Sequence, residues 1–124
     1  MTRTLLVTGG AGFIGSNFIH MIVEDRPDWK VVNFDALTYA GNLENLASLE
    51  SNPNVTFVQG DCAEPDDVQR GFDACGDGPV SVIHFAAESH VDRSILGGLP
   101  FVRANVLGTQ VMLDAARARK TERF

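Results

Sequence analysis

Four glycines near the start of the chain separate a short apolar run from a pattern of helical spacing. The apolar run, residues 4–8 (TLLVT), contains β-branched residues and no charge, which predicts a strand buried on both faces. The glycines lie in residues 8–15 (TGGAGFIG), and apolar residues recur at helical spacing from Phe13 until Pro27 ends the helix. This order of strand, tight turn and helix is typical of the units that build a parallel sheet.

The alternation of strand and helix continues along the chain. Apolar runs predict further strands at residues 31–35, 55–58 and 80–85. Helical spacing predicts helices at residues 43–49, 66–72 and 100–119. In the last helix the predicted apolar stripe consists of Val102, Val106, Leu113 and Ala116, with Met112 beside it. Four βα units predict an α/β protein of the Rossmann type, with a doubly wound parallel sheet and helices on both faces.

The glycines fit two overlapping dinucleotide-binding patterns. Gly10, Gly12 and Gly15 give G-x-G-x-x-G, while Gly9, Gly12 and Gly15 give G-x-x-G-x-x-G. Glycines at these positions let the chain turn sharply, let the backbone approach a pyrophosphate, and let the helix pack closely on the sheet. The unpaired N–H groups and positive dipole at the start of the helix favour a diphosphate. We therefore interpret the turn as a cofactor site rather than a glycine-rich connection without a ligand.

Acidic residues follow the second and third predicted strands. Asp35 stands about 20 residues after Gly15, where the fingerprint needs an acid to accept hydrogen bonds from the adenosine ribose. A 2′-phosphate would lie against this carboxylate, and residues 4–25 and 31–69 contain no Lys or Arg, so NAD is predicted over NADP unless a distant basic residue folds back. Asp61 lies on the adenine side of such sites, although a simple turn aspartate explains it nearly as well.

Other kinds of function find little support. The formal net charge of −6 disfavours nucleic acids and anionic membranes as partners. The sequence contains no P-loop and no H-E-x-x-H, and Cys62 and Cys75 match no zinc or redox spacing, so no metal site is predicted. Residues 4–23 lack charge, but glycines and polar residues interrupt them, which argues against a leader or a membrane span. Free cysteines in a reducing compartment and a cytoplasmic location are the expectation.

Residues 86–94 (AAESHVDRS) form a polar segment after the fourth strand. This position lies beside the switch point between the first and fourth strands, where open α/β sheets bind their ligands. A solvated loop is the alternative interpretation. His84, within the strand, is expected to be a hydrogen-bonded core histidine, whereas a ligand could reach His90.

Four segments together resemble a known family. Residues 8–15 resemble the start of the extended short-chain dehydrogenase/reductases. Residues 35–42 (DALTYAGN), 84–94 (HFAAESHVDRS) and 105–109 (NVLGT) narrow the resemblance to the dTDP-glucose 4,6-dehydratases. The resemblance implies that bound NAD⁺ takes hydride from C4 of the sugar, that water is lost across C5 and C6, and that the hydride returns to C6. It also implies a nucleotide-sugar substrate and, at full length, a homodimer.

The resemblance also assigns residues to the cofactor. Besides Gly9, Gly12 and Gly15, the expected cofactor-binding residues are Phe13, Ile14, Asp35, Ala36, Leu37, Thr38, Asp61, Cys62, Phe85, Ala86, Ala87, Glu88, Ser89 and Asn105. Ser89 is also expected to reach the sugar nucleotide. Ala104 stands where many members have Thr, and Ala36 replaces a lysine found in some members. The resemblance therefore leaves one hydroxyl contact to the cofactor open and removes one possible adenosine contact.

No catalytic residue is predicted within these 124 residues. The family's Tyr-x-x-x-Lys pair has no counterpart, because the only tyrosine is Tyr39 and Leu43 stands four positions later. We interpret residues 1–124 as the N-terminal part of the NAD-binding domain, without the C-terminal strands and the sugar-nucleotide lobe, and expect this chain alone to be inactive. The alternatives are a nucleotide-sugar 4-epimerase and a non-catalytic NAD-binding module.

Overall fold

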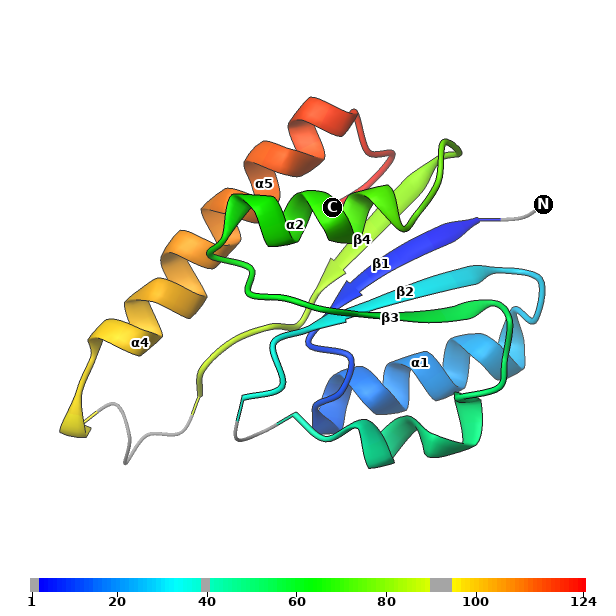
Figure 1. Cartoon of the computed structure of the whole chain (residues 1–124), viewed down its shortest axis with the longest axis horizontal. Helices are drawn as coiled ribbons and strands as arrows, with labels where there is room; N and C mark the ends of the chain where they lie inside the picture. The colour runs from blue at the N-terminus through cyan, green and yellow to red at the C-terminus, as the bar shows by residue number, and fades with distance from the viewer. Residues whose placement is uncertain (1–2, 39–40, 90–94) are drawn as a thin grey trace.

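A computed structural model describes residues 3–38, 41–89 and 95–124. Its strands are β1 (Thr4–Thr8), β2 (Lys30–Asp35), β3 (Val55–Gln59) and β4 (Val80–His84). Its helices are α1 (Phe13–Asp25), the 3₁₀ helix η1 (Leu43–Leu49), α2 (Pro65–Asp73), α4 (Leu99–Val102), the π-helical segment η2 (Arg103–Leu107) and α5 (Gly108–Arg119). The strands form one parallel sheet in the order β3-β2-β1-β4, so the predicted α/β fold is confirmed (Figure 1).

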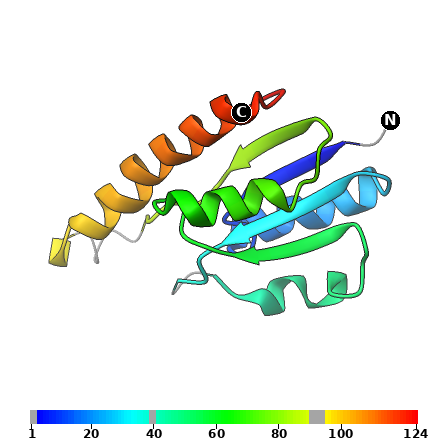
Figure 2. The same ribbon diagram turned by 45° about the horizontal axis from the view of Figure 1, so that its top comes forward.

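Helices cover both faces of the sheet (Figures 1 and 2). Along β1 and β2 successive side chains enter different cores, as the period of two in a strand requires. Leu6 and Phe34 contribute to the core under α2 and α5, whereas Leu5 and Val7 contribute to the core over α1 and η1. Burial on both faces explains why these strands are apolar without alternation.

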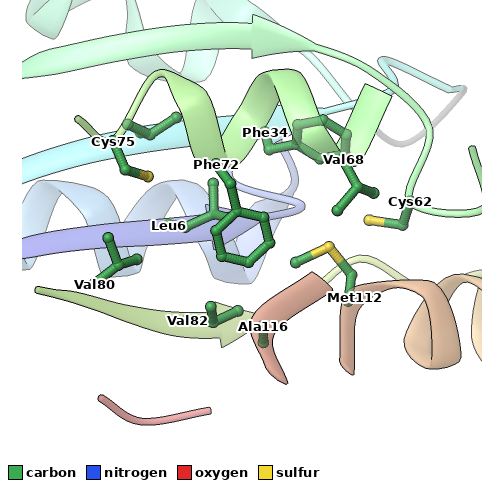
Figure 3. Packing of buried hydrophobic residues seen from close by; sticks show 11 residues of the cluster. Leu6, Phe34, Cys62, Val68, Phe72, Cys75, Val80, Val82, Met112 and Ala116 are labelled. Carbon is green, nitrogen blue, oxygen red and sulfur yellow. The ribbon is translucent and has the colours of Figure 1, made fainter. Parts of the chain in front are cut away.

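The core under α2 and α5 holds several of the largest buried side chains (Figure 3). Phe72 of α2, Leu6 of β1 and Met112 of α5 are each about 1% exposed and belong to one cluster. This packing fixes α2 and α5 beside each other over β1 and β4.

The predicted apolar stripe of the last helix is wrong in part. Met112 and Ala116 are buried, but Val102, Val106 and Leu113 are exposed. The buried positions are Gly108, Met112 and Ala116, spaced four apart on the face that meets α2 and the sheet. The helical segments before Gly108 extend past the carboxyl ends of the strands (Figure 1), and neither α4 nor η2 contains a buried residue. We call residues 99–107 the overhang.

The outer edge of β4 is partly covered by the last residues of the chain. The amide of Val82 donates to the carbonyl of Arg123 at 2.9 Å, and the amide of Glu122 donates to that of Val80 at 2.8 Å. Within the described residues, no helix is both long enough and apolar enough to cross a membrane.

Candidate functional site

The glycine turn connects β1 to α1 and has little room for side chains. Gly9 has φ +71°, in the left-handed region, and a Cβ there would lie 2.7 Å from the amide nitrogen of Ala86. A Cβ on Gly15 would overlap the carbonyl oxygen of Gly9, so the first turn of α1 packs directly on the loop. A Cβ on Gly10 would strike the side chains of Asn33 and Ile19, so that glycine serves packing on the sheet. Both overlapping glycine patterns therefore have a structural role.

Gly12 differs from the other three glycines. A Cβ built on it would meet only the carbonyl oxygen of Gly9, at 3.4 Å, and Gly12 lines a cavity. It is also the N-cap of α1, with no capping side chain and no acidic residue in the first turn. The side chains of Phe13 and Ile14 are 82% and 67% exposed. The helix therefore begins with backbone N–H groups and a positive dipole end that neither a capping side chain nor an acid of the first turn neutralises.

Asp35 joins the glycine turn to the end of β2. One carboxylate oxygen accepts from the amide of Ala11 at 2.9 Å, and the other accepts from the amide of Leu37 at 2.8 Å. The residue is 8% exposed, so its charge is held in a fixed orientation. A carboxylate offers about four acceptor positions, so each oxygen retains one for a further donor. Asp35 can thus shape the turn and accept ligand hydroxyls at the same time.

The end of β3 contributes a second acidic site. The carboxylate of Asp61 accepts from the amide of Ala63 at 2.8 Å and from the guanidinium of Arg103 at 3.1 Å. The same guanidinium donates to Glu64 at 2.5 Å. These hydrogen bonds, first to Glu64 and then to Asp61, raise the pKa of Arg103 above its usual range. Arg103 therefore carries a permanent charge that is already shared between two carboxylates.

Cys62 lies beside Asp61 as an unreactive thiol. Burial raises its pKa to about 12, and the negative charges of Asp61 and Asp35 act in the same direction. Burial likewise raises the pKa of Cys75 to about 11. Both cysteines are free, and neither is a thiolate at neutral pH.

A chain of hydrogen bonds runs from the end of β4 to the overhang. The amide of Ala86 donates to the Thr8 hydroxyl at 3.2 Å, and this hydroxyl lies 2.6 Å from Nδ1 of His84. Nε2 of His84 lies 3.1 Å from the hydroxyl of Thr109, which donates to the carbonyl of Asn105 at 2.7 Å. These directions are consistent only if neutral His84 carries its proton on Nε2 and accepts on Nδ1.

Burial lowers the pKa of His84, in agreement with the neutral form. His84 is hydrogen-bonded through both ring nitrogens as predicted, but it is only partly buried and belongs to neither core. Asn105, which receives the end of this chain, clamps the loop after β4. Its side chain accepts from the amide of Glu88 at 2.7 Å and donates to the carbonyl of Glu88 at 2.8 Å. The π-helical turn of η2 thus presents Asn105 to the loop, in keeping with the frequent use of such turns at functional sites.

One cavity of about 280 Å³ lies at the carboxyl ends of the strands. The predicted residues that line it are Gly9, Gly12, Asp35, Ala36, Thr38, Asp61, Cys62, Phe85, Ala86, Ala87 and Glu88. Other predicted residues do not line it, namely Phe13, Ile14, Gly15, Leu37, Ser89 and Asn105. Ser89 is exposed, and His90 lies outside the described residues, as do parts of the segments 35–42 and 84–94.

The cavity also has lining residues that the sequence did not single out. These are Phe34, Gly41, Gly60, Pro100 and Arg103. Phe34 and Gly60 adjoin predicted strand ends, so extending each predicted site by one residue would have found them. Pro100 and Arg103 belong to the overhang and carry no sequence signal of their own. Ala104 lines the cavity at the position where relatives of the predicted family have Thr.

A second cavity of about 410 Å³ lies between η1 and the strands β2 and β3. Its walls are mostly apolar, and it contains no glycine turn. Among the described residues, no group of three metal-ligating side chains gathers anywhere. The smaller cavity is therefore the candidate site, because it combines a bare helix start with oriented carboxylates.

Comparison with known proteins gives consistent matches along the chain. The chain is 52% identical over 120 residues to the low-salt glycan biosynthesis protein Agl12 of Haloferax volcanii, covering 97% of this chain and 37% of that protein. It is 53% identical over 114 residues to the dTDP-glucose 4,6-dehydratase of Xanthomonas campestris, covering 92% of this chain and 31% of that enzyme. The chain thus spans about a third of the length of these relatives.

Solved structures agree with the sequence relatives. DesIV, a dTDP-glucose 4,6-dehydratase of Streptomyces venezuelae solved with NAD and TYD bound, matches with a TM-score of 0.85 and 44% identity, over 96% of this chain and 37% of that one. A UDP-glucose 4-epimerase of Thermus thermophilus in complex with NAD matches with a TM-score of 0.81 and 31% identity, over 97% and 35%. The GDP-mannose 4,6 dehydratase family model matches residues 6–124. The chain therefore belongs to the GDP-mannose 4,6 dehydratase family.

Proposed function

We propose that these residues form the NAD-binding part of a nucleotide-sugar 4,6-dehydratase that acts on dTDP-glucose. The observation that carries the proposal is a pair of features at the neighbouring ends of β1 and β2: an uncapped helix N-terminus after β1 and, at the end of β2, a buried carboxylate that bonds the same turn. Crystals of DesIV with NAD bound support the assignment of the cofactor. When bound, NAD⁺ supplies a hydride acceptor, and the residues of this chain orient it.

Each part of the cavity has a partner in the dinucleotide. The amides of Phe13 and Ile14 at the start of α1 would bind the pyrophosphate, because they lie at a positive dipole end. Asp35 would accept from the ribose hydroxyls, with Ala36, Leu37 and Thr38 around it. Asp61 and Cys62 would face the adenine. The loop Phe85–Ser89, held by Asn105, would line the inner half of the cofactor and exclude water from it. Ser89 would reach the sugar nucleotide.

The preference for NAD over NADP follows from the charges of the cavity. Among the described residues that line it, Arg103 is the only cation, and it is paired with Asp61 and Glu64. A 2′-phosphate beside Asp35 would thus meet a carboxylate and no free positive charge. Among the described residues, Arg103 is thus the distant basic residue nearest to such a role, and it is already paired with two carboxylates.

Sequence identity favours a dehydratase activity over an epimerase activity. The dehydratases among the relatives are up to 53% identical to this chain, whereas the UDP-glucose 4-epimerases among the solved structures are 29–33% identical. The fold alone does not discriminate, because both groups have similar TM-scores.

Turnover needs groups that this stretch does not supply. Tyr39 is the only tyrosine and has no lysine four positions later, so no Tyr-x-x-x-Lys base removes the proton of the C4 hydroxyl. We propose that the chain binds cofactor and does not convert sugar nucleotide alone. We also propose a homodimer for the full-length protein, supported by the exposed apolar residues Leu99, Val102, Val106 and Leu113 on α4–α5. A cytoplasmic location fits the free, buried cysteines.

Calorimetric titration tests the cofactor assignment. We expect the purified protein to bind NAD⁺ and to bind NADP⁺ at least about tenfold more weakly, since repulsion by Asp35 costs on the order of 1.4 kcal/mol or more. Asp35→Ala should lose most NAD⁺ affinity. Equal affinity of the wild-type protein for the two cofactors would contradict the preference, and no binding of either would contradict the function. Conversion of dTDP-glucose by these 124 residues alone would contradict the proposed division of labour.

A further inference from the structure

We propose that Arg103 is a positioning residue that latches the overhang across the adenine end of the cavity and thereby controls release of the dinucleotide. This inference rests on the proposed function, because it assumes that the cavity holds the adenosine half of NAD. It adds a role for two residues, Arg103 and Glu64, that no pattern in the sequence singles out.

Among the described residues, few apolar contacts hold the overhang in place. Neither α4 nor η2 has a buried residue, and Leu99, Val102 and Val106 are largely exposed. Firm packing begins at Gly108, where a Cβ would lie 3.2 Å from Cβ of Cys62. Segments with few buried apolar contacts open at low free-energy cost. In a single copy of this chain, the part of the helix before Gly108 is therefore the wall of the cavity that can move most easily.

Among the described residues, side chains of the overhang bond to the rest of the chain at two places. Asn105 binds the backbone of Glu88 on the inner side of the cavity. Arg103 binds Asp61 and Glu64 on the outer side, across the loop between β3 and α2. Pro100, Arg103 and Ala104 line the cavity from the overhang, and Asp61 lines it from the opposite wall. The ion pairs therefore join two walls of the same cavity at its adenine end.

The arrangement also orients Asp61. One of its carboxylate oxygens accepts from the amide of Ala63, and the other accepts from Arg103. Its own amide donates to the carboxylate of Asp67 at 3.0 Å. Loss of Arg103 would free one oxygen of this carboxylate and, at the same time, remove the ion pairs that hold the overhang against the opposite wall of the cavity. Both effects would act on the adenine end of a ligand and not on its pyrophosphate.

Glu64 provides the sharpest test because it does not line the cavity. Its carboxylate touches Arg103 at 2.5 Å, so its effect on a ligand must pass through the guanidinium. Asp66 is the matched control, since it is an exposed acid in the first turn of α2 with no ion pair to Arg103. Removing either acid changes the net charge equally.

The experiment measures the dissociation rate of NAD⁺ from the purified protein by rapid displacement. Exposed ion pairs contribute modestly, so we expect about a 3- to 10-fold faster release from Arg103→Ala and about a 2- to 5-fold faster release from Glu64→Gln. Asp66→Asn should release NAD⁺ at the wild-type rate, and Arg103→Lys should lie between. High salt should accelerate release from the wild type and leave Arg103→Ala nearly unchanged, because screening weakens the ion pairs.

A second ligand locates the effect. AMP contains only the adenine end, so Arg103→Ala should weaken AMP binding by a factor similar to that for NAD⁺. Release of NAD⁺ that is unchanged in Arg103→Ala and Glu64→Gln would overturn the latch while leaving NAD binding intact. An equal effect of Asp66→Asn would overturn it too, because net charge would then explain the result. A wild-type protein that binds no NAD⁺ would overturn the proposed function itself. Circular dichroism of each variant verifies that it is folded.

Discussion

The two walls of the cavity are built in different ways. The wall formed by β1, β2 and the glycine turn is rigid backbone, in which Gly9 and Gly15 pack within the loop and Asp35 bonds the amide of Ala11. The wall formed by α4 and η2 has no buried residue and is held by the polar side chains of Arg103 and Asn105. In our proposals the first wall fixes where a diphosphate would lie, whereas the second permits entry and exit of the ligand. Rigidity and access are thus assigned to different segments of one site.

The largest contrast is expected in stability. Phe72→Ala should lower the free energy of unfolding by about 3–5 kcal/mol, because it leaves a cavity in the core under α2 and α5. Val106→Ala in the overhang should change it by no more than about 0.5 kcal/mol, since the side chain is exposed. Urea denaturation of both variants measures the difference. A comparable loss from Val106→Ala would show that the overhang is packed after all.

Substitutions in the glycine turn should separate folding from binding. Gly9→Ala should destabilise the protein by about 1–3 kcal/mol, because alanine is strained at φ +71° and its Cβ meets the backbone of Ala86. Gly12→Ala should cost less, about 0.5–1 kcal/mol, because alanine is a poorer N-cap than glycine, but it should weaken NAD⁺ binding, since its Cβ has space only where the ligand would lie. Gly78→Ala, with nothing within 4 Å, is the control. Thermal melts and titrations should be run side by side, and unimpaired NAD⁺ binding by Gly12→Ala would count against the diphosphate assignment.

Asp35→Asn tests the carboxylate that connects the glycine turn to the end of β2. The amide retains a single acceptor oxygen, so one of the bonds to Ala11 and Leu37 is lost together with the charge. We expect NAD⁺ affinity to fall about 10- to 100-fold, corresponding to roughly 1.4–3 kcal/mol for charge-assisted hydrogen bonds. Asp73→Asn, an exposed acid at the end of α2, should bind as the wild type does. Isothermal calorimetry distinguishes the two, and equal affinities would remove Asp35 from the site.

The smallest expected effect concerns pH. Burial lowers the folded-state pKa of His84 below its ordinary value near 6.5, so the unfolded chain binds a proton more readily than the folded one. The contribution of His84 to stability is therefore complete above that ordinary value and declines as the pH falls through it. Melting temperatures of the wild type should drop more between pH 7 and 5 than those of His84→Gln. If the melting temperatures of the two proteins fell in parallel with pH, His84 would be excluded as the source of the pH dependence.

Much of the fold could be predicted because local patterns determined it. The runs at residues 4–8 and 55–58 became strands with nearly the predicted limits, since β-branched apolar runs have few alternatives. The prediction that Val102, Val106 and Leu113 are buried was wrong, because helical spacing alone does not tell which apolar face of a helix meets the sheet. The buried face instead consists of Gly108, Met112 and Ala116. The small residues at either end of this set allow α5 to approach the rest of the chain closely.

The residues of the site also differ in whether local sequence patterns could predict them. Asp35 follows its strand and glycine turn in sequence, so spacing was enough to propose it. Arg103 meets Asp61 and Glu64 from about 40 positions away, and only the docking of α5 on the sheet brings them together. Contacts created by tertiary packing between unrelated segments have no counterpart in a linear motif. The least predictable part of the site is therefore the part that we expect to control release.

Trp29 has a practical consequence for these measurements. It is the only tryptophan, it precedes β2 at the opposite end from Asp35, and Arg3 and Arg26 lie 5.6 and 5.7 Å from its ring centroid. The length of β2 separates it from the cavity by roughly 20 Å. Its emission should thus report loss of the native state and remain insensitive to local opening at the far side. A single intrinsic fluorophore would allow denaturation to be followed independently of the motion that frees a ligand.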